Sequence, residues 1–260
     1  MVRLAVGLLF PGEMGAAVGA AVRAPVLWAS EGRSEATAAR AAGFEDAGSV
    51  AELVARSDVL LSICPPALAE QVARTVAEHG FGGLYVDANA IAPARMERIA
   101  ALFDRAVDGS IVAKTRLRLY LSGGEADVAE AAALFDAARV EAVLLPGGIG
   151  AASAFKVAFA GWNKIGAVLE AQAYAVARAY GLEAELAREG VDRARIGRSA
   201  GRAWRWIGEL HEIADTHAAL GLDDGIARGA AAALESWAEH RDDAGVPVEQ
   251  LLDELRGLGG

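Results

Sequence analysis

The stretch "LAVGLLFPGEMGAAVGAAV", residues 4–22, decides how this chain is expected to fold. Its residues 4–9 form a short apolar run that stops at Pro11-Gly12, which is typical of a strand buried on both faces. Residues 14–22 continue with small and apolar residues at helical spacing. The order of strand, glycine turn and helix predicts the first unit of a sheet that carries helices on both faces.

The same stretch has the position of a signal peptide, because it follows Arg3 near the start of the chain. A signal peptide needs roughly 7–15 uninterrupted apolar residues and then a cleavage site with small residues. Here Pro11, Gly12 and Glu13 interrupt the apolar run, and helical spacing resumes after them. We therefore favour a cytoplasmic protein, and the single cysteine, Cys64, fits a reducing compartment because it cannot form an intrachain disulfide.

Composition narrows the possible partners. The 260 residues are 54% apolar, which is enough for one large domain or two modest ones. A formal net charge of −10 argues against nucleic acid and anionic membrane surfaces as partners. No segment reaches about 18 apolar residues, so no membrane span is predicted. Four scattered histidines and one cysteine predict no metal site.

Strand-like and helical segments alternate along the first 150 residues. Further strands are predicted at 24–30, 58–66, 83–93, 106–112, 117–124 and 141–148, and helices at 33–43, 67–80, 94–106 and 125–138. This alternation predicts an α/β fold with a mostly parallel sheet. After Gly150 the sequence becomes alanine-rich and helical, which predicts a long interdomain helix over about 151–180 within an all-helical domain, 151–260.

The turn after the first strand carries an incomplete dinucleotide-binding pattern. The full pattern, G-x-G-x-x-G, permits a tight turn, close approach of the backbone to a pyrophosphate, and close helix–strand packing. Gly12 and Gly15 fit the second and third positions, but Phe10 stands at the first. The strand–helix context favours a Rossmann domain over 1–150 rather than an ordinary Pro-Gly turn. The residues expected at the pyrophosphate are Pro11, Gly12, Glu13, Met14 and Gly15.

The end of the second strand is where such domains read the adenosine ribose. An acidic residue there binds a 2′-hydroxyl, whereas an arginine suits a 2′-phosphate. The segment contains Ser30, Glu31, Arg33 and Ser34, so it offers an acidic residue for a 2′-hydroxyl and an arginine for a 2′-phosphate. Arg33 and Ser34 follow a glycine, which favours a phosphate cradle, and we therefore predict NADP rather than NAD.

Four motifs occur in an order that resembles a known superfamily. They are "PGEMG" (11–15), "SICPP" (62–66), "DANAIAP" (87–93) and "GGIGAASAFKVAFAGWNK" (147–164). Together they resemble the β-hydroxyacid dehydrogenases, which include 3-hydroxyisobutyrate and 6-phosphogluconate dehydrogenases. The nearest likeness is to the branch of NAD-binding phosphogluconate-dehydrogenase-like proteins. The resemblance covers nearly the whole chain and implies a homodimer formed through the helical domain.

The resemblance also assigns roles to individual residues. It implies that Cys64 and Pro65 line the cofactor cleft, and that Asn89 faces the nicotinamide and the substrate. It matches Lys156 to the catalytic lysine. Hydride transfer to a carbonyl builds negative charge on oxygen, which a nearby ammonium stabilises and protonates. A lysine among small apolar residues is equally compatible with a side chain that extends to the solvent at a boundary.

Two departures from the superfamily put a simple 3-hydroxy acid substrate in doubt. The loop that would bind a carboxylate is replaced by residues 108–114, and the asparagine expected four residues after the lysine is Ala160. Ser110, Lys114 and Asn163 remain as candidate substrate-binding residues.

The overall expectation is an NAD(P)-dependent oxidoreductase that acts on a hydroxyl or carbonyl of a small, hydroxy acid-like substrate. An imine reductase-like enzyme and a non-catalytic dinucleotide-binding protein are the alternatives. The substrate stays open at this stage.

Overall fold

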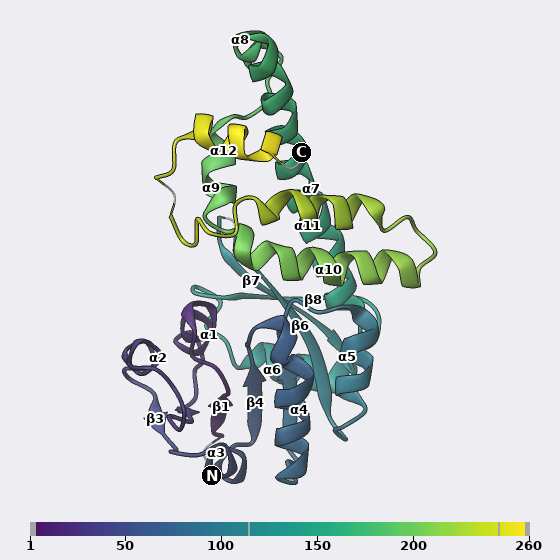
Figure 1. Ribbon diagram of the computed structural model, residues 1–260. Helices are drawn as coiled ribbons and strands as arrows, with labels where there is room; N and C mark the ends of the chain where they lie inside the picture. The colour runs from purple at the N-terminus through teal and green to yellow at the C-terminus, as the bar shows by residue number, and fades with distance from the viewer. Residues whose placement is uncertain (1–3, 114, 244, 258–260) are drawn as a thin grey trace. The chain divides into compact units, whose positions relative to one another are not determined.

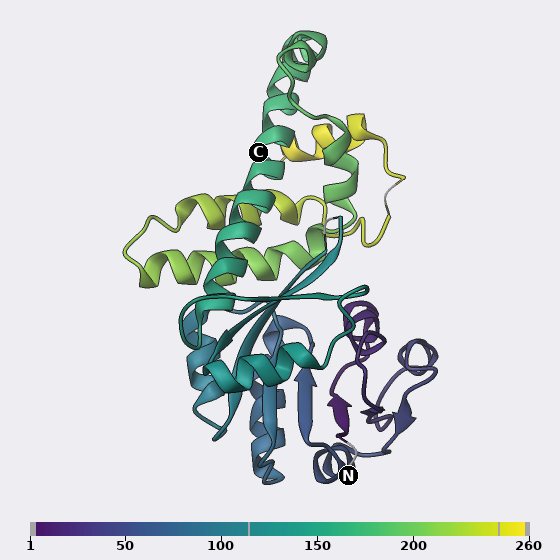
Figure 2. The same ribbon diagram turned by 180° about the vertical axis from the view of Figure 1, so that it is seen from behind.

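The computed structural model describes residues 4–113, 115–243 and 245–257. The chain divides into two compact units, Met1–Lys156 and Val157–Gly260. The first contains a sheet with helices on both faces, and the second is helical (Figures 1 and 2). This organisation confirms the predicted α/β fold with a Rossmann-like sheet, a long helix and an all-helical carboxyl-terminal part.

The described residues of the first unit form one eight-stranded sheet in the order β3-β2-β1-β4-β5-β6-β7-β8. Every neighbouring pair is parallel except β6 and β7, which are antiparallel. The strands are β1 (Val6–Leu8), β2 (Val26–Trp28), β3 (Glu45–Asp46), β4 (Val59–Ser62), β5 (Leu84–Asp87), β6 (Ala106–Ala113), β7 (Leu117–Gly123) and β8 (Glu141–Leu144).

Helices cover both faces of this sheet because the apolar residues of the strands point alternately to either side. On β4, Leu60 packs on one face, whereas Val59 and Leu61 pack on the other. One face is covered by α3 (Val50–Arg56), α4 (Ala69–Glu78) and α5 (Pro93–Ala100), and the other by α1 (Glu13–Gly19) and α6 (Glu125–Ala133). Figure 1 shows α4 and α5 in front of the sheet, and Figure 2 shows α6 in front of it.

All seven predicted strands are present, although several are shorter than expected. The segment 58–66 is a strand only over β4, because Pro65 and Pro66 begin the 3₁₀ turn η1 (Pro66–Leu68). Helix α2 (Glu35–Arg40) falls within the predicted segment 33–43. Strand β3 was not predicted, because its two residues are exposed and acidic and form no apolar run.

Helix α7 (Ala151–Tyr180) is the long helix predicted over about 151–180; its first residues belong to the first unit and the rest to the second. The second unit then contains α8 (Glu183–Arg188), α9 (Ala194–Ala200), α10 (Ala203–Ala219), α11 (Gly225–Glu235) and α12 (Val248–Arg256). Its core is rich in alanine, and α10 and α11 lie side by side (Figure 1). Among the described residues, no helix has the length and hydropathy that a membrane crossing requires.

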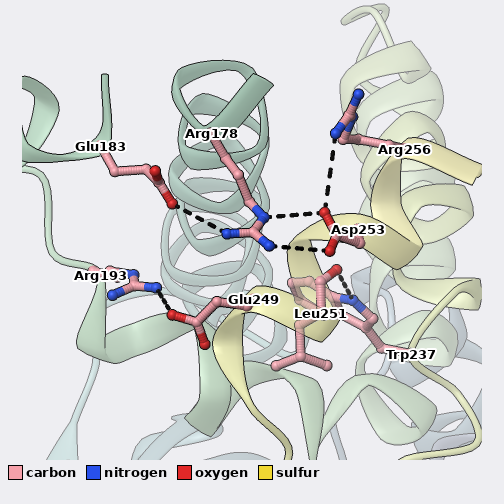
Figure 3. Close-up of polar contacts among 8 residues, drawn as sticks. All are labelled: Arg178, Glu183, Arg193, Trp237, Glu249, Leu251, Asp253 and Arg256. Atoms are coloured by element: carbon pink, nitrogen blue, oxygen red, sulfur yellow. Dashed lines mark hydrogen bonds and ion pairs between the residues drawn. The ribbon is translucent and has the colours of Figure 1, made fainter. Parts of the chain in front are cut away.

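The last helix, α12, packs against the other helices of the second unit through apolar and polar contacts (Figure 3). Leu251 and Leu252 are fully buried. Arg178 binds Asp253 through two hydrogen bonds, of 3.0 and 3.2 Å, and the indole of Trp237 donates to the Leu251 carbonyl at 3.0 Å. Exposed ion pairs contribute little to stability, so burial of the two leucines supplies most of the free energy that holds α12 in place.

Candidate dinucleotide-binding and catalytic site

The turn after β1 shows which of its glycines are required. A Cβ on Gly15 would lie 2.1 Å from the carbonyl oxygen of Phe10, so only glycine fits this close contact of helix and turn. A Cβ on Gly12 would meet no atom within 4 Å, so the backbone there is open to a ligand. The backbone φ of Phe10 is not positive, which explains why this turn forms without its first glycine.

A pocket of about 250 Å³ lies beside this turn. Its walls come from the loops after β1 and β2, from the start of α3, and from η1 and α4. It is lined by Leu9, Phe10, Arg33, Val50, Leu68, Gln71, Val72 and Thr75. The walls are mostly apolar, with one cationic side chain among them. A flat, apolar base attached to an anionic group suits such a lining.

Arg33 is fixed at this pocket by two contacts with the first turn. Its guanidinium carbon lies 3.8 Å from the centroid of the Phe10 ring, and its Nη2 donates to the Leu9 carbonyl at 3.3 Å. Its Nε is buried and has no hydrogen-bond partner within the described residues. Burial lowers the pKa of Arg33, but an arginine stays cationic at neutral pH.

Ser34 of the predicted phosphate cradle and the nearby candidate Ser30 both have structural contacts. The Ser34 hydroxyl accepts from the Thr37 amide at 3.3 Å and so caps α2. The Ser30 carbonyl accepts from the Arg33 amide at 3.0 Å. Hydrogen bonds from Gly48 and Ser30 lower the pKa of the exposed Asp46 carboxyl. Glu31, the alternative ribose-binding residue, is exposed.

Asn89 lies at the carboxyl ends of β4 and β5, and its side chain is only 3% exposed. Its Oδ1 accepts from the Cys64 amide at 2.6 Å. Its Nδ2 donates to Asp87 at 2.9 Å and to Ser62 at 3.1 Å. The amide thus ties the loop that starts at Cys64 to both strands.

Two groups in this network have shifted pKa values. Burial, followed by the charge of Asp108, raises the pKa of Asp87 to about 7, although hydrogen bonds from Asn89 oppose the shift. Burial also raises the pKa of the Cys64 thiol to about 12. The thiol is therefore protonated at neutral pH and contributes no nucleophile.

A second buried network joins the start of α7 to β6 and β7. The Asp108 carboxylate accepts from the Ser153 amide at 2.9 Å, the Ser153 hydroxyl at 2.7 Å and the Ser122 hydroxyl at 3.2 Å. The Ser122 hydroxyl in turn accepts from the Ala152 amide at 2.9 Å. These bonds satisfy amides in the first turn of α7, which has no side-chain cap of its own because Gly150 precedes it.

Lys156 lies one turn further along α7 and reaches the same strand. Its Nζ donates to the carbonyl of Ile111 at 2.7 Å. Ser110 is 1% exposed, and its hydroxyl has no hydrogen-bond partner among the described residues. Lys114 lies outside the described residues. The networks of Asp108 and Lys156 therefore attach the lysine-bearing turn to β6 at two places.

The remaining candidates lie in the second unit. The Asn163 Oδ1 accepts from Arg195 Nη2 at 2.9 Å. Ala160, at the position where the superfamily has an asparagine, is 4% exposed and belongs to the helical core. An amide at that position would bury polar atoms among apolar neighbours, which is a physical reason for alanine here.

Sequence reasoning missed several residues that hold the site together. Asp87, Ser62, Ser122 and Ser153 received no role, and the ring of Phe10 was treated only as a replaced glycine. One signal was available for Asp87, since an aspartate at the end of an apolar strand is unusual unless it is paired. The serines gave no such signal, because their partners are distant in the sequence.

Comparison with solved structures identifies the fold. The 3-hydroxyisobutyrate dehydrogenase of Mycobacterium tuberculosis, solved with L-serine, has a TM-score of 0.76 and 17% identity, covering 98% of this chain and 100% of that chain. Conserved protein MTH1747, described as similar to 3-hydroxyacid dehydrogenases, has a TM-score of 0.70 and 23% identity, covering 91% and 99%. An imine reductase from Myxococcus stipitatus with NADP⁺ has a TM-score of 0.57 and 18% identity, covering 95% and 99%. The predicted resemblance is confirmed: this chain has the 3-hydroxyacid dehydrogenase fold.

Sequence comparisons add one match. A family model described as a domain of unknown function, DUF1932, matches residues 171–237, which lie within the helical part of the chain. No curated protein matches the sequence significantly. The match leaves the activity to be argued from the site itself.

Proposed function

We propose that the chain is a nicotinamide-dinucleotide-dependent oxidoreductase that prefers NADP. The observation that carries this proposal is the pocket beside the glycine turn, where Arg33 stands among apolar walls. The pyrophosphate would lie against residues 11–15, where Gly12 leaves the backbone open. Arg33 would bind the 2′-phosphate that distinguishes NADP from NAD. Cys64 and Pro65 would border the cofactor.

The open backbone at Gly12 and the cationic Arg33 in an apolar pocket fit a dinucleotide. When bound, a reduced nicotinamide supplies a hydride for a carbonyl carbon or an equivalent acceptor. Lys156 would give a proton to the carbonyl oxygen in the direction of reduction, and its neutral amine would take the proton back in the direction of oxidation. The Ile111 carbonyl orients that amine. The amine is the group on which this mechanism depends.

The substrate would be a small molecule with a hydroxyl or carbonyl group, resembling a hydroxy acid. Ser110 supports this proposal with a buried hydroxyl that lacks a partner among the described residues. Asn163 is the second proposed contact, and Asn89 would act from the cofactor edge through the Cys64 loop. Lys114 keeps its proposed role as a cation for an anionic substrate group.

The test begins with binding and continues with turnover. Enhancement of reduced-nicotinamide fluorescence measures Kd for NADPH and NADH, and a panel of hydroxy acids, aldehydes, ketones and imines is then followed by absorbance of the reduced cofactor. Lys156→Met is expected to lower kcat at least 100-fold and to leave the Kd of NADPH within about twofold. Lys156→Arg is the matched variant, since it keeps the cation and the donor to Ile111 but does not release a proton. Undiminished turnover in either variant would reject the mechanism.

The panel also separates the two alternative functions. The NADP⁺-bound imine reductase of the same fold is the reason for including imines. Turnover of imines without turnover of carbonyl compounds would favour imine reduction. Tight binding of NADPH without any turnover would favour a non-catalytic dinucleotide-binding protein.

We further propose a homodimer formed through α7. Trp162, Leu169 and Val176 recur every seven residues along this helix and are 66%, 60% and 62% exposed. Trp162 and Leu169 also line a groove of about 390 Å³, with Gly161 and Gly166 among its other lining residues. An apolar ridge beside such a groove suits packing against a second copy of the same helix. Sedimentation of wild type and of Leu169→Glu tests this, since the charge would be buried in the dimer.

The cytoplasm is the compartment we propose. Cys64 is a free thiol, and the pKa of about 12 keeps it protonated and unreactive. Because the sequence has one cysteine, no intrachain disulfide stabilises the fold, which suits a reducing compartment.

A further inference from the structure

Phe10 stands where the dinucleotide-binding pattern has its first glycine, and it has a contact that glycine could not make. Its ring lies under the Arg33 guanidinium, with 3.8 Å between the guanidinium carbon and the ring centroid. Both side chains line the same pocket of about 250 Å³. The replacement therefore changes the wall of the pocket as well as the turn.

This stacking restricts an otherwise mobile side chain. An arginine has many rotamers, and ordering them costs free energy when a ligand binds. Here the Phe10 ring holds one face of the guanidinium, and the Leu9 carbonyl accepts from Nη2 at 3.3 Å. A guanidinium that is ordered before binding offers its remaining donors to a phosphate at a lower entropic cost.

The unpaired donor of Arg33 points to the same conclusion. Its Nε is buried without a partner among the described residues, although a buried donor is usually satisfied. Moving the side chain into solvent would satisfy it, but the ring and the Leu9 carbonyl hold it in place. Because Nε is buried, an anion in the pocket would accept from the other donors of this side chain, which lines the pocket.

We propose that Phe10 is a specificity-determining residue for NADPH and that it acts through Arg33. Phe10 holds the guanidinium at the edge of the pocket in an orientation that suits a 2′-phosphate. This inference rests on the proposed dinucleotide-binding function and assigns part of its cofactor preference to the residue that replaced the glycine.

The test compares the Kd of NADPH with that of NADH in matched variants. The two nucleotides differ only in the 2′-phosphate, so a general loss of packing in the pocket affects both and cancels in their ratio. Phe10→Leu removes the aromatic face and keeps an apolar side chain, whereas Phe10→Tyr keeps the ring. We expect Phe10→Leu to lower the preference for NADPH about three- to tenfold and Phe10→Tyr to leave it within about twofold. Phe10→Met is a second ring-less variant in case Phe10→Leu does not fold.

A double-mutant cycle with Arg33→Ala shows whether Phe10 acts through the arginine. In the Arg33→Ala background, Phe10→Leu is expected to leave the preference unchanged, because the group it orients is gone. An unchanged preference in both ring-less variants of the wild-type background would overturn the inference, as would an equal loss in both backgrounds. Failure of the wild-type protein to bind either nucleotide would instead reject the proposed function.

Discussion

The β4–β5 edge and the β6–α7 junction each contain a buried aspartate, and the two differ in what surrounds the carboxylate. Asp87 and Asp108 are paired in register on adjacent strands and are 1% and 0% exposed. Asp87 accepts hydrogen bonds from the Asn89 amide and side chain. Asp108 accepts from Ser122 and from two groups of Ser153.

The difference lies in what each carboxylate holds in place. Burial raises the pKa of both, and hydrogen bonds oppose the shift in both. Through Asn89, Asp87 supports the loop that starts at Cys64, which we propose borders the cofactor. Asp108 supports the first turn of α7, from which Lys156 extends. Two similar residues thus hold the proposed cofactor-binding part and the proposed catalytic part of the site in place.

The largest expected effect is on the pH dependence of stability at Asp87. Its pKa rises from an ordinary 3.8 to about 7 in the folded protein, so between these values the folded state holds a proton that the unfolded state lacks. The stability contributed by this group is fully present below pH 4 and is lost as the pH rises toward 7 and above. Asp87→Asn does not ionise, so from pH 4 to 8 its stability should rise relative to wild type by about 4 kcal/mol.

Urea unfolding at a series of pH values measures this difference. Asp104→Asn is the control, because it makes the same chemical change at an exposed position. A constant difference between wild type and Asp87→Asn across this range would contradict the assignment. Asp108 is present in both proteins, so only the part of its ionisation that depends on the Asp87 charge adds to the difference.

The second-largest effect is a loss of stability when Asp108, which accepts several hydrogen bonds, is replaced. Asp108→Ala leaves the Ser153 amide, the Ser153 hydroxyl and the Ser122 hydroxyl without this acceptor, and we expect a loss of about 3 kcal/mol in the free energy of unfolding. Ser153→Ala removes only the hydroxyl and keeps the amide bond, so about 1 kcal/mol is expected. Hydrogen exchange at residues 151–156 should accelerate more in Asp108→Ala. Equal losses in the two variants would mean that the carboxylate does not cap α7.

The smallest effect is expected at Asn89, at the carboxyl ends of β4 and β5, where we propose that the cofactor binds. Asn89→Ala removes the acceptor for the Cys64 amide, and we expect the Kd of NADPH to rise about fivefold because the loop loses its attachment. Ser62→Ala removes only one partner of Asn89 and should change that Kd less than twofold. The fluorescence titration used for the wild type measures both. If Ser62→Ala raised the Kd more than Asn89→Ala, the Cys64 loop would not be held mainly by Asn89.

The sequence predicted the fold well, because each buried strand corresponds to a short apolar run in the local sequence. The runs that became β4 and β5 are apolar and short, and they end in residues that cannot continue a buried strand. The long helix from Ala151 was equally readable from its spacing. Strand β3 escaped because it pairs through its backbone and its side chains are exposed.

The site was predicted only in part. Arg33 was named from its residue type and position and Lys156 from the resemblance; Arg33 lines a pocket, and the Lys156 amine donates to a carbonyl of β6. The stacking of Phe10 on Arg33 could not be predicted, because the two residues are 23 positions apart and their contact depends on the side-chain rotamers. The role of Ser122 depends in the same way on the register of β6 and β7, and that of Ser153 on the packing of α7 against β6.

The amino-acid sequence by itself determined the alternation of strands and helices, the glycine turn and the types of the chemical groups, because these follow from local periodicity and side-chain chemistry. Only the tertiary structure decided which groups meet. It placed Phe10 against Arg33, Asn89 against Cys64, and Asp108 at the start of α7, because hydrogen bonds and ring contacts require atoms within a few ångströms, and strand register brings distant residues that close.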